Sequence, residues 1–172
     1  MKVYLCADYS RREELQEIAR QLIGHAVVSR WVFGGHETPE IAAHGIADNQ
    51  PAPAEGLGWA VEDVADVGRC EVLVAFADGP TRACPRCKGT GLGVDRNPAS
   101  NFNCSRCMGS GKVERLWQRG GWHVEFGLAL AQGKHLILVG QPENVFHHLP
   151  QVRVIPEVGE RCADLLAALE AA

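Results

Sequence analysis

The sequence lacks long apolar runs, an excess of basic residues and a leader-like start. No apolar stretch approaches the roughly 18 residues that a membrane-spanning helix needs. The formal net charge is −4 at pH 7, which gives no general attraction to nucleic acid or to anionic membranes. The opening residues, MKVYLCADYSRREEL, contain neither the longer apolar segment nor the cleavage site of a secretory signal. We therefore expect a cytoplasmic protein.

The sequence does contain enough apolar material for one α/β domain. It has 172 residues, of which 46% are hydrophobic. Short β-rich runs alternate with segments of helical spacing, and this alternation predicts a parallel sheet with helices on both faces. Five strands favour a flavodoxin-like order, 2-1-3-4-5. We expect strands over 2–7, 26–33, 71–77, 135–140 and 152–155, and helices over 10–24, 59–70, 120–133 and 158–172.

Local patterns predict details of these helices. Ser10 and Glu13 fit a capping box at the start of the first helix, and Ile23 belongs to its expected inner face. In the second helix, Ala60, Val64 and Val67 recur at helical spacing. In the last helix, the expected inner residues are Cys162, Leu165, Leu166 and Leu169. The isolated cysteines Cys6, Cys70 and Cys162 are expected to be buried as small apolar side chains.

The four remaining cysteines form two pairs in the middle of the chain. They are spaced C-x2-C-x16-C-x2-C, which suits a zinc ion held by four thiolates in a closed structural site. The alternative is a set of redox pairs or free thiols. We predict that residues 79–118 form a zinc-binding flap inserted into a single domain spanning residues 1–172. The ligands would be Cys84, Cys87, Cys104 and Cys107.

The unusual segments follow the predicted strands. Residues 8–10, 34–58, 78–121 and 140–143 all lie where strands end, which is the edge that binds ligands in such sheets. Glu125 lies among apolar neighbours near the start of a helix. From this residue alone, a solvated first-turn carboxylate and a functional one both fit.

Three segments together resemble the nucleoside 2-deoxyribosyltransferase family. They are KVYLCADY, EDVADVGRCEVLVAF and GGWHVEFGLALAQGKHLILVG, and the resemblance covers the chain apart from 79–118 and part of 34–58. The superfamily also contains nucleoside-monophosphate N-glycosidases. PENVFHHLP looks like a variant found in phage-type relatives, and the repeated CxxCxGxG motif is similar to the zinc-binding region of DnaJ-type co-chaperones.

The resemblance implies a role for three residues. Glu125 matches the nucleophile that attacks the anomeric carbon, Tyr4 matches a tyrosine that orients this carboxylate, and Asp63 matches the acid that protonates the leaving base. This chemistry suits carboxyl groups, because breaking an N-glycosidic bond builds positive charge on the sugar. We expect the neighbouring Val61, Val64 and Trp59 to raise the pKa of Asp63 by burying it.

The substrate-binding residues are expected at the same edge. The transferases of this family have an Asp six residues before the Glu, where this chain has Arg119, so the resemblance does not extend to their sugar-binding arrangement. Arg119 is a candidate for a 5′-phosphate contact, and a bound phosphate would favour hydrolysis over base exchange. Arg11 and Arg12 are further phosphate candidates, although solvated helix positions suit them better. Trp31, Trp59 and Trp122 could stack on a base or fill the core. The expected binding residues are Ala7, Asp8, Tyr9, Ser10, Arg11, Trp59, Arg119, Gly120, Gly121 and Trp122.

Two functions follow from this reading. The first is an enzyme that cleaves or exchanges the N-glycosidic bond of a (deoxy)nucleoside or its 5′-monophosphate, without an organic cofactor. The second is a non-catalytic nucleotide sensor whose zinc flap contacts a partner or, through its many basic residues, nucleic acid. Because relatives complete their pockets across subunits, we also expect a homodimer.

Overall fold

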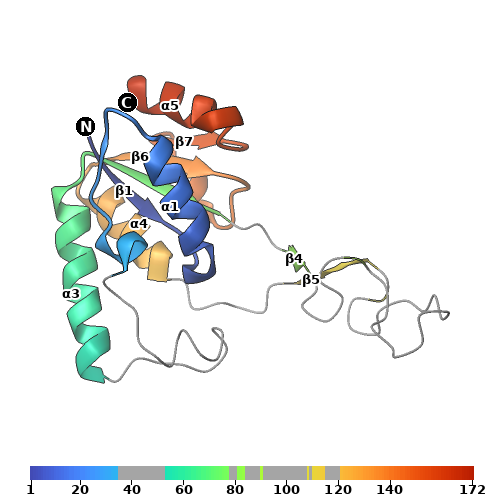
Figure 1. Cartoon of the computed structure of the whole chain (residues 1–172), viewed down its shortest axis with the longest axis horizontal. Helices are drawn as coiled ribbons and strands as arrows, with labels where there is room; N and C mark the ends of the chain where they lie inside the picture. The colour runs from blue at the N-terminus through green and yellow to red at the C-terminus, as the bar shows by residue number, and fades with distance from the viewer. Residues whose placement is uncertain (35–52, 78–80, 84–89, 91–107, 109, 115–120) are drawn as a thin grey trace. The chain divides into compact units, whose positions relative to one another are not determined.

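A computed structural model describes residues 1–34, 53–77, 81–83, 90, 108, 110–114 and 121–172 (Figure 1). The chain separates into two compact units. Unit 1 combines Met1–Ala77 with Gly120–Ala172, and unit 2 is Asp78–Arg119. The predicted insertion at 79–118 falls within unit 2.

Unit 1 is built on a five-stranded parallel sheet. Its order is β2-β1-β3-β6-β7, so the predicted order 2-1-3-4-5 is confirmed. All five residues of the central strand β3, VLVAF, are buried, as expected for a parallel strand covered on both faces. The bounds are β1 Lys2–Cys6, β2 Ala26–Val27, β3 Val72–Phe76, β6 His135–Val139 and β7 Val152–Ile155.

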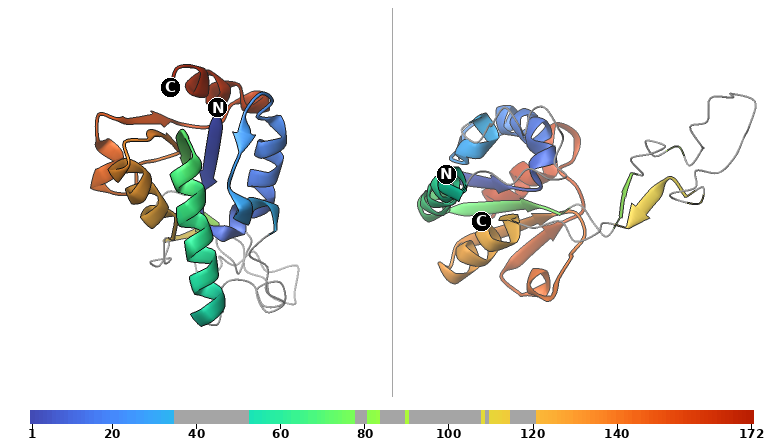
Figure 2. Two further views of the ribbon diagram at one scale, coloured as in Figure 1. Left: turned by 90° about the vertical axis from the view of Figure 1, so that its left-hand side faces the viewer. Right: turned by 90° about the horizontal axis from the view of Figure 1, so that it is seen from below.

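Helices cover both faces of this sheet. Helices α3 and α4 pack against each other, and both contact β1. Helix α1 packs against the 3-10 turn η4 (Glu160–Cys162), and Figure 2 shows α1 and α4 on opposite sides of β1 and β3. The sheet therefore presents one side of β1 to α3 and α4. The helix bounds are α1 Arg12–Gln21, α3 Pro53–Arg69, α4 Gly121–Ala131 and α5 Ala163–Glu170.

The predicted capping box of the first helix is wrong. Residues Tyr9–Arg11 form a 3-10 turn, η1, and α1 begins after Arg11, whose side chain makes no capping hydrogen bond. The Arg11 backbone N–H donates to the Asp8 carbonyl at 2.9 Å, which closes a tight turn before the helix. Ile23 is 85% exposed and not on the inner face, because α1 ends at Gln21.

The second strand is much shorter than predicted. β2 contains only Ala26–Val27, and η2 (Arg30–Phe33) is a 3-10 turn. Side chains replace the missing strand, since Ser29 Oγ accepts from the Leu5 backbone N–H at 2.6 Å and Trp31 Nε1 donates to the Leu5 carbonyl at 3.1 Å. The backbone of β1 is thus satisfied without further strand pairing.

Helix α3 starts earlier than predicted and buries a different face. It begins at Pro53, a residue favoured at the first helical position. Of the residues at helical spacing, Val67 is buried, whereas Ala60 is exposed and Val64 is 53% exposed. Polar Asp66 shares the inner face with Val67, so the apolar pattern marks this face only in part.

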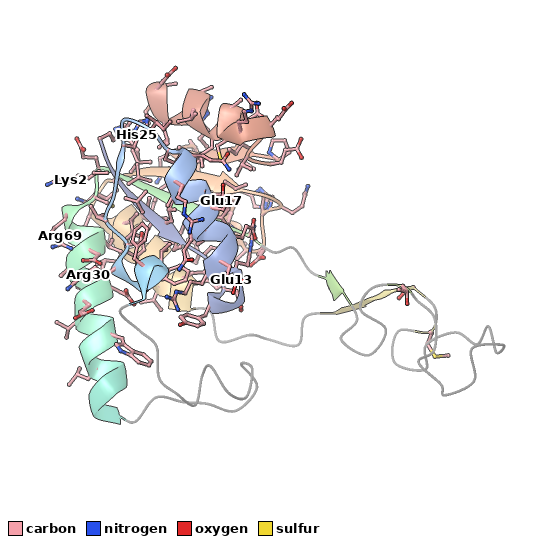
Figure 3. All side chains as sticks on the ribbon, viewed as in Figure 1. Lys2, Glu13, Glu17, His25, Arg30 and Arg69 are labelled. Atoms are coloured by element: carbon pink, nitrogen blue, oxygen red, sulfur yellow. The ribbon has the colours of Figure 1, made fainter. Side chains whose placement is uncertain are left out.

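Ion pairs explain why Asp66 can be buried. Its carboxylate accepts from Arg30 Nε at 3.0 Å and from the Arg30 backbone N–H at 3.0 Å, and it also pairs with Arg69. Arg30 and Arg69 both lie along α3 in Figure 3. This buried carboxylate therefore ties η2 to α3.

The C-terminal helix and the isolated cysteines agree with the sequence. Leu165 and Leu169 of α5 are buried and Leu166 is partly buried. Cys6, Cys70 and Cys162 are buried free thiols, as predicted. Lys134, which follows α4, donates from Nζ to the carbonyls of Gly68 at 3.0 Å and Cys70 at 2.8 Å, and thereby caps the C-terminus of α3.

The described part of unit 2 is a small antiparallel ladder. β4 (Thr81–Ala83) pairs with β5 (Lys112–Glu114), with Ala83 opposite Lys112. The predicted zinc ligands Cys84, Cys87, Cys104 and Cys107 lie outside the described residues. Within the described parts of the chain, no helix combines the length and apolar character needed to cross a membrane.

Candidate active site

Tyr4 occupies the middle of β1 and is fully buried. Side chains alternate along a strand, so Tyr4 and Cys6 share the face covered by α3 and α4, while Val3 and Leu5 point to the other face. Carboxyl groups from both covering helices act on the Tyr4 phenol. The strand therefore directs this hydroxyl towards the helices and not into solvent.

Glu125 lies on the inner side of α4. Trp122, Phe126 and Ala129 are buried, and Glu125 falls on this stripe because residues three and four apart share a helix face. It is the one Asp, Glu, Lys or Arg in α4 and is only partly exposed. The interpretation as a solvated first-turn carboxylate therefore does not describe this side chain.

Asp63 approaches from α3. It lies one turn before Val67, whose side chain is fully buried, and is itself partly buried. The sequence-based reason for its burial is wrong, since Val61 and Val64 are 60% and 53% exposed. Asp63 is shielded because its helix face packs towards the sheet, where Tyr4 lies.

Burial makes both carboxyl groups weak acids. It raises the pKa of Asp63 from its ordinary 3.8 to about 7, with the charges of Asp66 and Glu62 adding to the rise. It also raises the pKa of Glu125 from 4.5 to about 8, and the nearby Asp63 charge contributes. Two carboxyls that repel each other in this setting hold about one proton between them near neutral pH.

The Tyr4 hydroxyl acts on both carboxyl groups. Hydrogen bonding from this hydroxyl favours the ionised forms and lowers the pKa of each acid, against the effect of burial. Its own pKa is raised strongly, first by burial and then by the charges of Glu125 and Asp63, so it stays a donor. Among the described residues, no group meets strict hydrogen-bond geometry with this hydroxyl, so the Tyr4 oxygen is near both carboxyls without an ideal hydrogen bond to either.

Cys6, expected only as a buried apolar side chain, lies near the Glu125 carboxyl. Its thiol is fully buried, and its pKa is raised by burial and by the charge of Glu125. The period of two along β1 places it on the side of Tyr4, and this was the available sequence signal. The raised pKa keeps this thiol neutral beside Glu125.

The proposed phosphate-binding residues follow the end of β1. Ala7 is the next residue, and Asp8, Tyr9 and Ser10 lead through η1 to Arg11. The Arg11 guanidinium lies 5.3 Å from the centre of the Phe76 ring, at the end of β3, and pairs with Glu14. Arg11 therefore stays at the carboxyl edge of the sheet.

Arg12 has a structural role. It donates to the Val32 carbonyl at 3.2 Å and to the Tyr9 hydroxyl at 3.1 Å, and so holds η2 against α1. The Tyr9 ring lies 6.0 Å from that of Trp31, which is buried. These contacts turn Arg12 and Trp31 towards the packing between η2 and α1.

The remaining candidate binding residues lie in different surroundings. Trp59 is partly buried on α3, Gly121 begins α4, and Trp122 is buried with its ring 5.4 Å from that of His147. Arg119 and Gly120 lie outside the described residues.

A histidine cluster lies beyond Trp122. The amide nitrogen of Asn144 lies 3.3 Å from His123 Nδ1 and 3.2 Å from His147 Nε2. Burial lowers the pKa of His147 to about 4, helped by His123 and His148, and also lowers the pKa of His123. Both rings are therefore neutral at pH 7. Within the described ranges, no group of three or more His, Cys, Asp or Glu residues could hold a metal ion.

A pocket of about 420 Å³ lies along α4 beside this cluster. Its lining does not include Tyr4, Asp63 or Glu125. The lining residues are His123, Phe126, Gly127, Leu130, Asn144 and Phe146. This pocket is therefore separate from the carboxyl pair.

No protein-family model matches the chain, and no curated protein matches it. Among solved structures, it is similar to the CMP N-glycosidase BcmB of Clostridium botulinum, with 17% identity, a TM-score of 0.43 and full coverage of both chains. A chain this different in sequence need not share that enzyme's activity.

Proposed function

We propose that the chain breaks the N-glycosidic bond of a (deoxy)nucleoside or nucleoside 5′-monophosphate and passes the sugar to water or to a second base. One observation carries the proposal: Glu125, Asp63 and Tyr4 reach the same buried region from α4, α3 and β1. Two buried carboxyls with raised pKa values, joined by a phenol, are unusual outside functional sites. The family resemblance in the sequence assigns roles to the same three residues.

The shared proton sets the starting state. The productive form has an ionised Glu125 and a protonated Asp63. Burial raises the pKa to about 8 for Glu125 and about 7 for Asp63, so before substrate binds a single proton on the pair lies mainly on Glu125. An electropositive anomeric carbon beside Glu125 would stabilise its charge and shift the proton to Asp63. The Tyr4 hydroxyl would donate to the ionised carboxylate and hold it in place.

The reaction then takes two steps, in which the sugar passes first to Glu125 and then to water. The Glu125 oxygen attacks the anomeric carbon, while the C–N bonding electrons leave with the base and the base nitrogen takes the Asp63 proton. A glycosyl ester on Glu125 results. In the second half, Asp63, now ionised, accepts a proton from water, and the resulting hydroxyl displaces Glu125 from the sugar. Acceptance by a second base would give exchange in place of hydrolysis.

The edge beyond β1 supports a phosphorylated substrate. Arg11 lies over the end of β3, where ligands of parallel sheets bind. Arg119 is proposed as a second cation from the sequence alone. A 5′-monophosphate bound there would favour hydrolysis.

We also propose that unit 2 holds a structural zinc ion. The β4–β5 ladder pairs Ala83 with Lys112, and both Cys pairs fall between these two residues in the sequence. Four thiolates at this spacing suit zinc, which would supply rigidity and no chemistry because its coordination is complete. Cys84, Cys87, Cys104 and Cys107 would be the ligands. The homodimer expected from the sequence is part of this proposal as well.

Base release tests the enzyme proposal. Purified protein is incubated with nucleosides and their 5′-monophosphates, and free base is measured by chromatography. Glu125→Gln should lower release by at least about 1,000-fold, since it removes a nucleophile. Glu13→Gln, on the exposed side of α1, is the matched control and should keep wild-type activity.

Two outcomes would overturn the assignment. Release that survives Glu125→Gln would remove Glu125 as nucleophile. Tight binding of a nucleotide without release by the wild type would favour the sensor function instead.

A further inference from the structure

Lys134 is fixed at the end of α4 by its own backbone. Helix α4 ends at Ala131, and Gly133 follows with a φ of +65°, which glycine adopts without strain. The Gly133 N–H donates to the Leu130 carbonyl at 3.1 Å. The Lys134 N–H reaches further back, to the Ala129 carbonyl at 3.0 Å. These two bonds form a Schellman motif, which fixes the Cα of Lys134 relative to α4.

The side chain of Lys134 reaches the other helix on this side of the sheet. Its Nζ donates to the carbonyl of Gly68 at 3.0 Å and to that of Cys70 at 2.8 Å, where α3 ends. Carbonyls in the last turn of a helix lack a partner within the helix and carry partial negative charge. An ammonium group supplies both the hydrogen bonds and the opposite charge. Lys134 therefore joins the C-terminal ends of α3 and α4.

The two helices joined in this way are the two that carry the buried carboxyl groups. Asp63 lies five residues before Gly68 on α3. Glu125 lies six residues before Ala131, the last residue of α4. At roughly 1.5 Å of rise per residue, each carboxyl lies within about two turns of the joined ends. The helices pack against each other (Figure 2), so a slide of one along the other would change the separation of the carboxyls.

A second anchor of α3 acts in a different direction. Asp66 ties α3 to η2 through the backbone N–H and the guanidinium of Arg30. That contact fixes the place of α3 relative to η2, which follows β2. The hydrogen bonds of Lys134 fix α3 relative to α4, and so relative to the helix that carries Glu125.

Lys134 lies at the edge of the sheet opposite to the one that binds ligands. It immediately precedes β6, whose first residue is His135, so it lies at the amino end of that strand. Ligands of parallel sheets bind at the carboxyl ends. The five residues of β6 separate the two edges by roughly 13–16 Å. Any effect of Lys134 on a reaction must therefore pass through the helices.

We propose that Lys134 is a positioning residue, which sets the spacing between the proton donor Asp63 and the nucleophile Glu125 by fixing α3 against α4. This inference rests on the proposed function and extends it to a residue far from the reacting atoms. The acid must reach the base nitrogen while the nucleophile reaches the anomeric carbon of the same bound nucleoside. A misplacement of about 1 Å can lower a rate on the order of 100-fold, so the join between the helices matters for the reaction.

Two substrates test this role. Lys134→Met keeps the apolar stem and removes both hydrogen bonds to α3. For a natural nucleoside or its monophosphate, we expect kcat to fall about 10- to 100-fold with little change in KM. A substrate whose leaving group needs no proton should lose less than about 3-fold, because the spacing from Asp63 matters only when the acid acts. In the Asp63→Asn variant, adding Lys134→Met should lower kcat little further, since the group that it positions is already absent.

Lys134→Arg and Lys2→Met are the controls. A guanidinium can donate to both carbonyls of α3, so Lys134→Arg should keep most of the wild-type kcat. Lys2 is an exposed lysine at the amino end of β1, and Lys2→Met should leave kcat and KM unchanged. Circular dichroism establishes that each variant is folded before its kinetics are compared.

Titration of the carboxyls reports the same spacing without any enzyme activity. The charge of Asp63 contributes to the raised pKa of Glu125, so Asp63→Asn should lower that pKa. If Lys134 sets the spacing, the decrease should be smaller when Lys134→Met is also present, because the interaction between two charges weakens with distance. Carbon-13 NMR of the side-chain carboxyls over a pH series measures the decrease in both backgrounds.

The outcomes separate the positioning role from the enzyme. Equal losses of kcat for the two substrates in Lys134→Met would overturn the assignment, and so would an equal decrease in the pKa of Glu125 with and without Lys134. A protein that releases no base, but in which the decrease depends on Lys134, would support the spacing role and count against the enzyme. Base release that Lys134→Met leaves at the wild-type rate would support the enzyme and overturn the role of Lys134.

Discussion

The Glu125 carboxyl of α4 lies beside the Tyr4 hydroxyl of β1, on the side of the sheet where α3 also contributes Asp63. A phenol and two acids in one buried place oppose the usual preference for apolar contacts there. The cost of burying them appears directly in the raised pKa values of both carboxyls. Four predictions follow from this group and from its supports.

Removing the Glu125 charge should stabilise the fold at alkaline pH. The folded-state pKa, about 8, exceeds the ordinary 4.5, so this group favours the folded protein below pH 4.5, and this contribution is lost as pH rises towards 8. Glu125→Gln should therefore raise the free energy of unfolding by about 1–3 kcal/mol at pH 8 and by far less at pH 4. Chemical denaturation at both values measures the difference.

The same variant on the surface supplies the comparison. Glu13→Gln on the exposed side of α1 should show no such pH-dependent gain. Equal effects of the two variants at pH 8 would mean that Glu125 is solvated like Glu13.

The loss of kcat on replacing Asp63 should depend on how much the leaving base needs a proton. Asp63→Asn removes the proton donor, and we expect kcat to fall about 100- to 10,000-fold for a natural nucleoside. A substrate whose leaving group needs no proton should lose much less, because Glu125 still attacks. Equal losses for the two substrates would contradict the role of Asp63 as the acid.

The pH dependence of kcat/KM should be a narrow bell. Activity needs one proton on the pair, so it should fall below about pH 7 as the second proton binds and above about pH 8 as the last one leaves. Initial rates from pH 5 to 10 give the profile. In Asp63→Asn the alkaline fall should disappear, and its persistence there would assign it to another group.

Loss of Asp66 should lower the stability of unit 1 and leave the proposed catalytic residues in place. Asp66→Ala would remove the partner of Arg30 and Arg69 and leave the Arg30 backbone N–H without its acceptor. We expect a loss of about 2–3 kcal/mol in the free energy of unfolding. Glu62→Ala, which removes a more exposed partner of Arg30, should cost under about 1 kcal/mol. Equal costs would show that burial of Asp66 is irrelevant.

The order of the strands in the sheet could be predicted from the sequence because the strands are short, apolar runs. β3 and β6 have no competing pattern, and all but one of their residues are buried. The residue at which β2 ends could not be predicted, since Ser29 and Trp31 replace strand pairing through side-chain hydrogen bonds to Leu5. Such long-range contacts leave no local signal.

The carboxyl site, too, could be predicted only in part from the sequence. The family resemblance predicts roles for Tyr4, Asp63 and Glu125, whereas helical spacing alone left Glu125 ambiguous. Asp66 was missed because a buried acid breaks the apolar pattern that marks an inner face. Its pairing with Arg30, 36 residues away, and with Arg69 explains it. The zinc ligands remain a prediction from their spacing.

The side-chain hydrogen bonds to Leu5 also protect the molecule from unwanted strand addition. With β2 only two residues long, the later part of β1 would present a free N–H and a free carbonyl at an open edge. Ser29 and Trp31 occupy both groups, and both side chains are buried. A foreign strand therefore finds no template there, and replacing Ser29 with alanine would open this position to aggregation.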